Sequence, residues 1–318
     1  MKKVLVTGTS GYIGSRVVRH LKDNGCDVVA TSRVVPYSLA AELGVEVYAL
    51  DVLQAPIELP VAKGADCLVH CATANDILSR DFRAGVDLSV SGTWRMLEFA
   101  KANGIPHVIF FSTFQVYGTE LNGMVNEDTP VNCESVYGLN HWFGEESCRL
   151  FCALHGLSIS VVRPSNVYGA PTVSTVNRGT LVPMCFVQEA LDTGGITLRS
   201  SGRQRRNFVS TKEVAVASAH LVKNPPSGFQ IFNICSELHA SMKEIAILTG
   251  ELYEERFKSP LALKTLSNLP EQGNQFQAES RLHVLQVPKD ESWRMMREEI
   301  ATLFSQFQQT TKITKTTI

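Results

Sequence analysis

The chain lacks a long hydrophobic run. None of its segments reaches the ~18 consecutive apolar residues that span a bilayer. The glycines that follow the apolar residues 4–6 leave no space for the apolar stretch of a signal peptide. The 318 residues therefore predict a cytoplasmic protein with no membrane partner.

An excess of charge of either sign is also lacking. The 30 basic and 31 acidic residues leave a formal net charge of −1, so electrostatics give no reason to expect nucleic acid as a partner. The cysteines, 8 in all, are too few and too irregularly spaced for a disulfide framework, and no histidine cluster completes a zinc site with them. We expect reduced thiols and no bound metal.

In place of these features, the first half of the chain alternates β-branched runs with amphipathic segments of helical length. Apolar residues are continuous within each run, which is typical of strands covered on both faces. Because strand and helix alternate, the strands are expected to be parallel, with right-handed crossovers. The predicted fold class is α/β, a doubly wound parallel Rossmann sheet with a smaller C-terminal α/β substrate lobe. The expected strands are residues 3–7, 27–31, 45–50, 67–71, 108–112 and 158–162, and the expected helices of this half are 13–24, 86–103 and 136–155.

The composition of the sequence changes near residue 170, where Gly, Ser, Thr and Arg become frequent. We expect a dinucleotide-binding Rossmann domain over residues 1–169, with its sheet completed by residues 206–235. The remaining segments are too interrupted to form an independent core. They are predicted to form the substrate-binding lobe, at residues 170–205 and 236–307, and a flexible tail at 308–318.

The chain opens with a strand, a glycine-rich turn and the start of a helix. Gly8 permits the tight turn, Gly11 lets the backbone approach a pyrophosphate, and Gly14 lets the helix pack on the strand. The helix N-terminus offers free N–H groups and a positive dipole to phosphates. The residues predicted to bind the cofactor in this loop are Gly8, Ser10, Gly11, Tyr12, Ile13 and Gly14.

The end of the second predicted strand indicates which dinucleotide is bound. An acidic residue there would bind the ribose 2′-hydroxyl of NAD, but this chain has Ser32 and Arg33. A hydroxyl beside an arginine favours a 2′-phosphate, through charge-assisted hydrogen bonds. We therefore predict NADP as the favoured cofactor, with NAD as the alternative.

Further motifs follow at residues 50–52 (LDV), 70–73 (HCAT), 90–93 (VSGT), 112–118 (STFQVYG), 137–141 (YGLNH), 163–169 (RPSNVYG) and 202–208 (GRQRRNF). In this order and spacing the chain, from Lys2 to about Ser241, resembles the extended short-chain dehydrogenase/reductase family. It is most similar to the NAD(P)-dependent nucleotide-sugar epimerase/dehydratase group. The resemblance implies hydride transfer at a carbinol or keto carbon of a nucleotide-diphosphate sugar.

The resemblance also implies the site residues. Thr113 would hydrogen-bond a substrate oxygen, and Tyr137 would exchange a proton with a substrate hydroxyl while hydride moves to or from nicotinamide. Asn166 and Arg206 would contact the substrate, and an arginine fork suits a diphosphate; Arg203 and Arg205 make the same stretch basic. The further positions implied for the cofactor are Asp51, Val52, Cys71, Ala72, Thr73, Ser112, Tyr137, His141 and Pro164.

The sequence departs from the family pattern at His141, where relatives have a lysine four residues after the tyrosine. That spacing keeps both side chains on one helical face. Lysine is a cation at pH 7, whereas histidine has an unperturbed pKa of ~6.5 and is mostly neutral above pH 7. Histidine could still donate one hydrogen bond to ribose. Three alternatives follow: a histidine helper, a different base, or loss of redox turnover.

Two neighbouring residues argue against one class of reaction, 4,6-dehydration. Relatives that are 4,6-dehydratases have an Asp-Glu pair after the catalytic threonine, and this chain has Phe114 and Gln115, which do no acid or base work. Epimerisation and ketone reduction stay open, as do reduction of a non-sugar carbonyl and a catalytically silent dinucleotide sensor. Relatives commonly dimerise through two long helices, so the resemblance implies a homodimer through residues 86–103 and 136–155. The apolar faces of these helices could equally pack within the chain.

Overall fold

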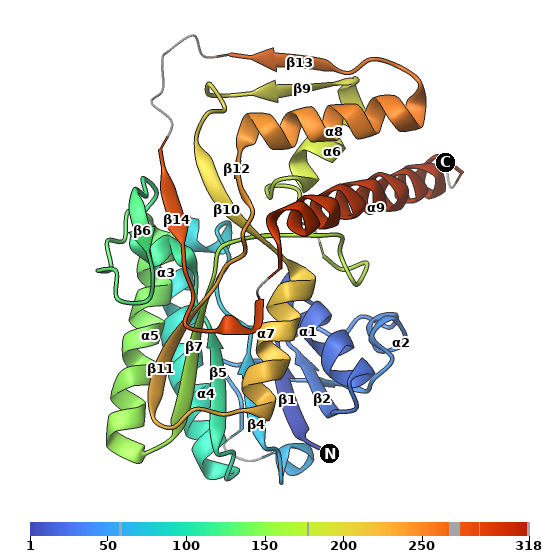
Figure 1. Cartoon of the computed structure of the whole chain (residues 1–318). Coiled ribbons are helices and arrows are strands. Elements are labelled where there is room, and N and C mark those ends of the chain that lie inside the picture. Colours follow the sequence, from blue (N-terminus) through green and yellow to red (C-terminus); the bar gives the residue numbers. More distant parts are fainter. Residues whose placement is uncertain (57–58, 177, 267–273, 286, 317–318) are drawn as a thin grey trace.

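A seven-stranded sheet forms the centre of the computed structural model, which describes residues 1–56, 59–176, 178–266, 274–285 and 287–316 (Figure 1). The strand order is β11-β7-β5-β4-β1-β2-β3, and every neighbouring pair is parallel. The predicted α/β fold class and doubly wound Rossmann sheet are confirmed. The strands are β1 (Lys3–Thr7), β2 (Asp27–Ser32), β3 (Val47–Ala49), β4 (Cys67–His70), β5 (His107–Phe111), β7 (Ser158–Pro164) and β11 (Phe229–Ile234).

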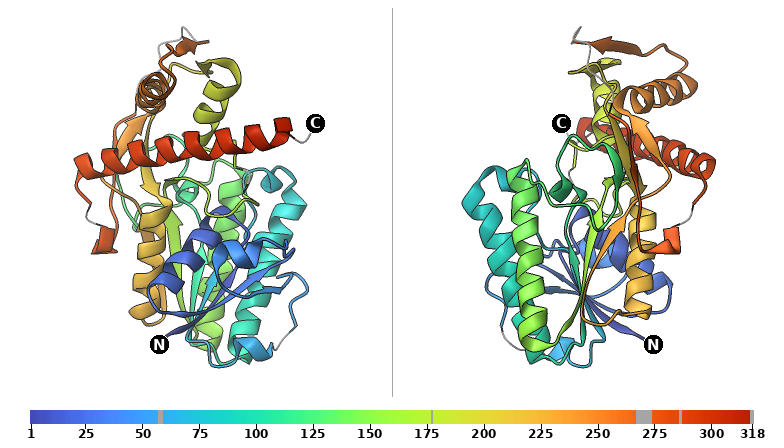
Figure 2. Two further views of the ribbon diagram at one scale, coloured as in Figure 1. Left: turned by 90° about the vertical axis from the view of Figure 1, so that its right-hand side faces the viewer. Right: turned by 60° about the vertical axis from the view of Figure 1, so that its left-hand side comes forward.

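Helices cover both faces of this sheet (Figure 2). In β1, Val4 and Val6 face a core that α1 and α7 close, while Leu5 faces the core under α4 and α5. This two-sided burial is why the strands are continuously apolar instead of alternating. The helices are α1 (Tyr12–Asp23), α2 (Leu39–Leu43), α3 (Phe82–Val86), α4 (Gly92–Ala102), α5 (Val136–His155) and α7 (Thr211–Lys223).

The helix predicted at residues 86–103 is divided in the structure. A π-helical turn, η3 (Asp87–Ser91), separates α3 from α4. Within that turn the Ser89 hydroxyl accepts a hydrogen bond from the backbone N–H of Ala74 at 3.0 Å. The irregular turn therefore ties the helix to the segment that follows β4. The 3₁₀ turns are η1 (Pro60–Ala62), η2 (Leu78–Arg80), η4 (Phe114–Tyr117) and η5 (His283–Leu285).

The smaller lobe stands on the carboxyl edge of the large sheet (Figure 1). A three-stranded sheet in the order β12-β10-β8 joins the two parts. Of the segment expected to complete the large sheet, β11 does so, whereas β10 belongs to this small sheet. The lobe contains β8 (Asn166–Tyr168), α6 (Met184–Thr193), β9 (Gly195–Leu198), β10 (Arg205–Ser210), β12 (His239–Ser241), α8 (Met242–Phe257), β13 (Ala262–Thr265) and α9 (Lys289–Thr316), and beside it β6 (Gly123–Val125) pairs with β14 (Phe276–Ala278).

The last helix runs through most of the predicted tail. Met296, Ile300, Leu303 and Phe304 recur at helical spacing and are fully buried in the core of the lobe. That apolar face anchors α9, and the helix continues to Thr316. The segment from residue 308 is thus helical where a flexible tail was expected, and residues 317–318 lie outside the described residues.

Candidate active site

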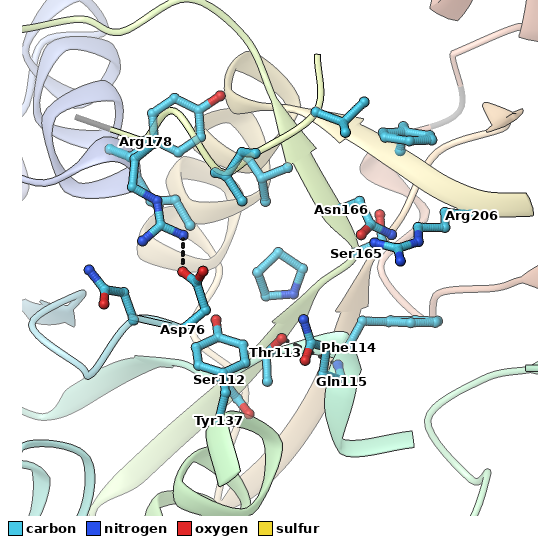
Figure 3. A pocket seen from close by; sticks show the side chains of 18 of the residues that line it. Asp76, Ser112, Thr113, Phe114, Gln115, Tyr137, Ser165, Asn166, Arg178 and Arg206 are labelled. Atoms are coloured by element: carbon cyan, nitrogen blue, oxygen red, sulfur yellow. Dashed lines mark hydrogen bonds and ion pairs between the residues drawn. The ribbon is translucent and has the colours of Figure 1, made fainter. Parts of the chain in front are cut away.

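A cavity of about 580 Å³ opens between the carboxyl edge of the large sheet and the lobe (Figure 3). Its wall is built from the glycine loop, the ends of β4, β5 and β7, the start of α5 and parts of the lobe. The predicted site residues that line it are Gly8, Gly11, Tyr12, Ile13, Gly14, Cys71, Thr73, Ser112, Thr113, Tyr137, Pro164, Asn166 and Arg206. The other predicted positions, Ser10, Ser32, Arg33, Asp51, Val52, Ala72 and His141, lie off this wall.

The glycine positions of this loop have little space for a side chain. Gly8 has a φ of +70°, and a Cβ on Gly14 would lie 2.3 Å from the carbonyl oxygen of Gly8. The N-cap of α1 is Gly11, which supplies no side-chain cap, and the first turn carries no acidic residue. The free N–H groups of this helix end therefore face the cavity uncompensated, which fits the pyrophosphate of a dinucleotide.

Most of the residues expected at the far end of the cofactor have partners within the chain. Ser32 donates to the carbonyl oxygen of Val34 at 2.7 Å, and its hydroxyl lies 2.8 Å from that of Ser10. Arg33 is exposed. A carboxylate oxygen of Asp51 accepts from the backbone N–H of Leu53 at 3.0 Å. Val52 packs in the core, and Ala72 donates its N–H to the hydroxyl of Thr7.

Thr113 and Tyr137 come from two elements that pack closely together. Thr113 follows β5 and caps η4, where its hydroxyl accepts from the N–H of Gln115 at 3.2 Å. Tyr137 lies in the first turn of α5, which Ser135 caps by accepting from the N–H of Gly138 at 3.0 Å. A Cβ on Gly138 would lie 2.8 Å from the carbonyl oxygen of Gln115. This glycine lets α5 approach η4 and so brings the tyrosine beside the threonine.

The side chain of Tyr137 is half-buried on the cavity wall, and several groups shift the pKa of its phenol in opposite directions. Burial raises its pKa above the ordinary value, a hydrogen bond with Thr113 and the guanidinium of Arg178 act to lower the pKa, and the carboxylate of Asp76 acts to raise it. At neutral pH the phenol is therefore protonated in the free protein and poised to donate a proton.

His141 lies off the cavity wall, and both of its ring nitrogens have partners within the chain. Its Nδ1 lies 3.0 Å from the carbonyl oxygen of Tyr137 and its Nε2 lies 3.3 Å from the hydroxyl of Thr73. Because a carbonyl only accepts, Nδ1 carries the proton and Nε2 accepts from Thr73. Burial lowers the pKa of His141 to about 4, so the ring is neutral at pH 7. Its single N–H is already used by the backbone, which leaves none for a cofactor ribose.

An ion pair that the sequence motifs did not reveal also lines the cavity. The guanidinium Nη2 of Arg178 lies 2.8 Å from Oδ1 of Asp76, and the hydroxyl of Thr180 contacts the other carboxylate oxygen at 3.5 Å. Asp76 follows β4 at the edge where ligands bind, which is the one signal that could have singled it out. Arg178 lies in an irregular segment between β8 and α6, with no motif to mark it.

The basic stretch at residues 203–206 places one unpaired charge on the cavity wall. Arg205 pairs with Glu244 at 3.1 Å, and Arg203 is exposed away from the wall. Arg206 lines the cavity, and within the described part of the chain no carboxylate forms an ion pair with it; its guanidinium donates to Gln204 at 3.2 Å. The amide of Asn166 donates to a carbonyl oxygen of β10 at 2.9 Å. Arg206 is thus the arginine of this stretch that lines the cavity without an ion pair to another described residue.

A buried ion pair supports the wall from behind. Arg163 donates to both carboxylate oxygens of Glu145, at 2.9 and 2.5 Å, and to the hydroxyl of Tyr117 at 2.8 Å. The hydroxyl of Ser112, next to Thr113, donates to the same carboxylate. Both charged side chains are almost fully buried, at 3% and 2% exposed. The network fixes the end of β5 relative to α5.

Comparison with known proteins identifies the family. The model of the NAD dependent epimerase/dehydratase family matches residues 4–235. The chain belongs to this family. It is similar to a putative UDP-glucose 4-epimerase of Methanocaldococcus jannaschii, with 28% identity over 68% of this chain and 72% of the relative. It is also similar to a dTDP-glucose 4,6-dehydratase of Streptomyces griseus, with 30% identity over 78% of this chain and 77% of the relative.

A solved structure has the same fold. The UDP-glucuronic acid 4-epimerase of Bacillus cereus, in complex with UDP-glucuronic acid and NAD, aligns with a TM-score of 0.78 at 21% identity, over 95% of this chain and 99% of that chain. The relatives of this family member include proteins named as nucleotide-sugar epimerases, dehydratases and reductases.

Neither a membrane span nor a metal site is found among the described residues. No helix among them is long and apolar enough to cross a membrane. Within the same residues, no group of three or more His, Cys, Asp and Glu side chains could hold a metal ion. All 8 cysteines lie in the described part of the family member, and each is free.

Proposed function

We propose that the protein is an NAD(P)-dependent oxidoreductase or epimerase that acts on a nucleotide-diphosphate sugar by hydride transfer at a carbinol or keto carbon. One observation carries the proposal: Thr113 and Tyr137 meet on the cavity wall between the glycine loop and the unpaired Arg206. A pyrophosphate cradle and a second anion site thus flank a proton donor, which is the order of groups that such a reaction needs.

The chemistry divides between the cofactor and the protein. Bound nicotinamide supplies a hydride acceptor or donor. Thr113 holds the substrate oxygen, and in the reducing direction the phenol of Tyr137 gives its proton to that oxygen as hydride reaches the carbon. The oxidising direction needs Tyr137 as the phenolate, whose oxygen takes the proton of the substrate hydroxyl. Phe114 and Gln115 border the same cavity and carry no acid or base, which supports epimerisation or reduction over dehydration.

The test of this proposal is turnover of a panel of UDP- and GDP-sugars with NADPH, NADH and their oxidised forms, over pH 6 to 9. Absorbance of the reduced nicotinamide reports net redox, and sugar analysis after the reaction reports epimerisation. A non-sugar carbonyl panel in the same assay covers the alternative substrate class. Absence of turnover with every substrate would overturn the proposal.

A substitution of Arg206 is expected to weaken substrate binding. Arg206→Gln removes the unpaired guanidinium that suits a diphosphate bidentately, and charge-assisted hydrogen bonds contribute about 1.5–3 kcal/mol each. We expect KM for the nucleotide sugar to rise at least tenfold, with little change in kcat. Arg83→Gln, an exposed arginine on α3, is the matched control. An unchanged KM would place the diphosphate elsewhere.

The choice between NADP and NAD depends on Arg33. We propose NADP, because Arg33 is the exposed cation at the end of β2 and the hydroxyl of Ser32 already has partners. Structures of similar fold are described with NAD, so NAD is the alternative. Fluorescence titration with NADPH and NADH compares the two directly, and tighter binding of NADH would overturn the preference.

A second candidate function is favoured by His141. A neutral imidazole with no N–H left for ribose is compatible with a catalytically silent dinucleotide sensor, which would bind cofactor without turnover. We expect His141→Lys to raise the rate of hydride transfer at pH 8 or above, because a cation beside Tyr137 lowers the pKa of the phenol. His155→Lys, at the exposed end of α5, is the control. A slower His141→Lys enzyme would show that the site is tuned around imidazole.

We also propose a cytoplasmic homodimer. The eight free thiols suit a reducing compartment. On α5, Leu150 and Leu154 are 47% and 61% exposed, so an apolar strip of this helix is available for a second copy. Light scattering on the purified protein measures the oligomeric state, and a monomer at micromolar concentration would contradict this part.

A further inference from the structure

Few charged groups surround the phenol of Tyr137. His141 from α5 is neutral at pH 7, for the reasons given above. Cys71 lines the cavity after β4, and burial raises its pKa, so its thiol is uncharged as well. Arg178 and Asp76 form an ion pair on the wall of the same cavity, and Arg178 acts to lower the pKa of Tyr137 while Asp76 acts to raise it. Both charges of this ion pair therefore bear on the electrostatics of the proton donor.

Arg178 is held by the segment that carries it. Between β8 and α6 this segment crosses the glycine loop, where the hydroxyl of Thr175 donates to the carbonyl oxygen of Ser10 at 3.0 Å. One residue earlier, Ser174 donates its N–H and its hydroxyl to the carboxylate of Glu42 at 2.6 and 2.7 Å. These contacts fix the segment to the Rossmann domain on the approach to Arg178. The side chain of Arg178 is 17% exposed.

Asp76 is fixed from the opposite wall. The preceding residue, Asn75, caps the turn that follows. The side-chain amide oxygen of Asn75 accepts hydrogen bonds from the N–H groups of Ile77 and Leu78 at 3.1 and 2.8 Å. Figure 3 shows Arg178 and Asp76 meeting on the side of the cavity toward which the Tyr137 ring points. The ion pair and the phenol therefore share one end of the cavity, and Arg206 lies across it.

We propose that Arg178 supplies the positive field at Tyr137 that a lysine at position 141 would supply, and that Asp76 orients this cation and limits its effect. This inference rests on the proposed function, since it concerns the same proton donor. Arg178 acts through Tyr137 and is a positioning residue. It reaches the phenol from the lobe side of the cavity, whereas position 141 lies behind the tyrosine on α5.

The physical reason is the sign of each charge. A cation near a phenol stabilises the phenolate, and a carboxylate near it destabilises the phenolate; an opposite charge within ~4–6 Å shifts a pKa by about 1–3 units. Removing Arg178 should therefore raise the pKa of Tyr137. Removing the charge of Asp76 should lower the pKa, because Arg178 then acts unopposed. A merely structural role for the pair predicts no such opposite pattern.

The experiment titrates Tyr137 in the full-length free protein. Tyrosine labelled with ¹³C at Cζ gives one NMR signal for each ring, and loss of a signal in Tyr137→Phe identifies the one from position 137. We expect Arg178→Gln to move its titration to higher pH and Asp76→Asn to move it to lower pH, by about one unit each. Arg178→Lys keeps the positive charge, so Tyr137 should titrate close to where it does in the unsubstituted protein. Arg83→Gln should leave the titration unchanged.

The result can be separated from the fate of the proposed function, because the titration needs neither substrate nor turnover. If the pKa moves as expected and no sugar is turned over, this inference stands and the enzymatic proposal fails. If sugars are turned over and neither variant moves the pKa of Tyr137 nor the pH profile of hydride transfer, the inference fails. Shifts of the same sign in Arg178→Gln and Asp76→Asn would also overturn it. Circular dichroism confirms that each variant is folded.

Discussion

Replacing Tyr137 by phenylalanine is expected to slow hydride transfer by about 10²–10⁴-fold, which is the usual contribution of a positioned acid or base. The substitution removes one oxygen and keeps the ring, so the packing of α5 against η4 is retained. Thr113 would still hold the substrate oxygen, but no group at that point would give or take its proton. Single-turnover absorbance of the reduced nicotinamide, with saturating sugar, measures the rate.

The matched control is Tyr37→Phe, because Tyr37 is fully exposed in a loop after β2. We expect it to have the rate of the unsubstituted protein. Binding of NADPH, followed by fluorescence, should be the same in both variants, since the glycine loop is untouched. If Tyr137→Phe kept the full rate, proton transfer would have to pass through another group, and the assignment of Tyr137 would be wrong.

Replacing Glu145 by glutamine is expected to lower the free energy of unfolding by about 3–5 kcal/mol, because the guanidinium of Arg163 is then left buried without a counter-charge. Urea unfolding measured by circular dichroism gives the change. The loss should be largely independent of salt, since water and ions do not reach a pair so deeply enclosed. Activity should fall as well, because the same carboxylate holds Ser112 beside Thr113.

The neighbouring residue offers a matched control on the same helix. Glu146 pairs with Arg149 at 2.6 Å, but the side chains are 41% and 58% exposed. Exposed pairs contribute about 0–1 kcal/mol, so Glu146→Gln should change stability little. Equal effects from the two substitutions would show that burial of the Arg163–Glu145 pair does not set its importance. The two variants remove the same charge from adjacent positions, which isolates the environment as the variable.

The regular part of the fold could be predicted from the sequence, because strands that are buried on both faces appear in the sequence as continuous apolar runs. The helix predicted at residues 136–155 has those bounds in the structure, since Ser135 caps its start and Gly156 ends it in a left-handed conformation. The glycine loop is equally local, because strand, turn and helix follow one another within a few residues. Where one element depends on its neighbours in the sequence, periodicity and capping are enough.

The features that could not be predicted from the sequence depend on contacts between segments that are distant along the chain. The π turn at η3 exists where Ser89 meets Ala74, and no periodicity within residues 86–103 marks that meeting. The sequence placed His141 on the same helical face as Tyr137, but its hydrogen bond to Thr73 needs the end of β4. Asp76 and Arg178 meet only because the segment after β8 crosses the cavity. Sequence motifs marked where the site lies, whereas these pairings decide its electrostatics.

The Rossmann half and the lobe each supply part of the cavity wall. Thr113 and Tyr137 stand on the Rossmann half, and Arg205, Arg206 and Met242 reach the cavity from the lobe. Loops and small sheets tolerate replacement better than a buried parallel sheet does. Under the proposed function, substitutions in the lobe can therefore change which nucleotide or sugar binds while Thr113 and Tyr137 stay in place. The architecture thus allows specificity to change without a change in chemistry.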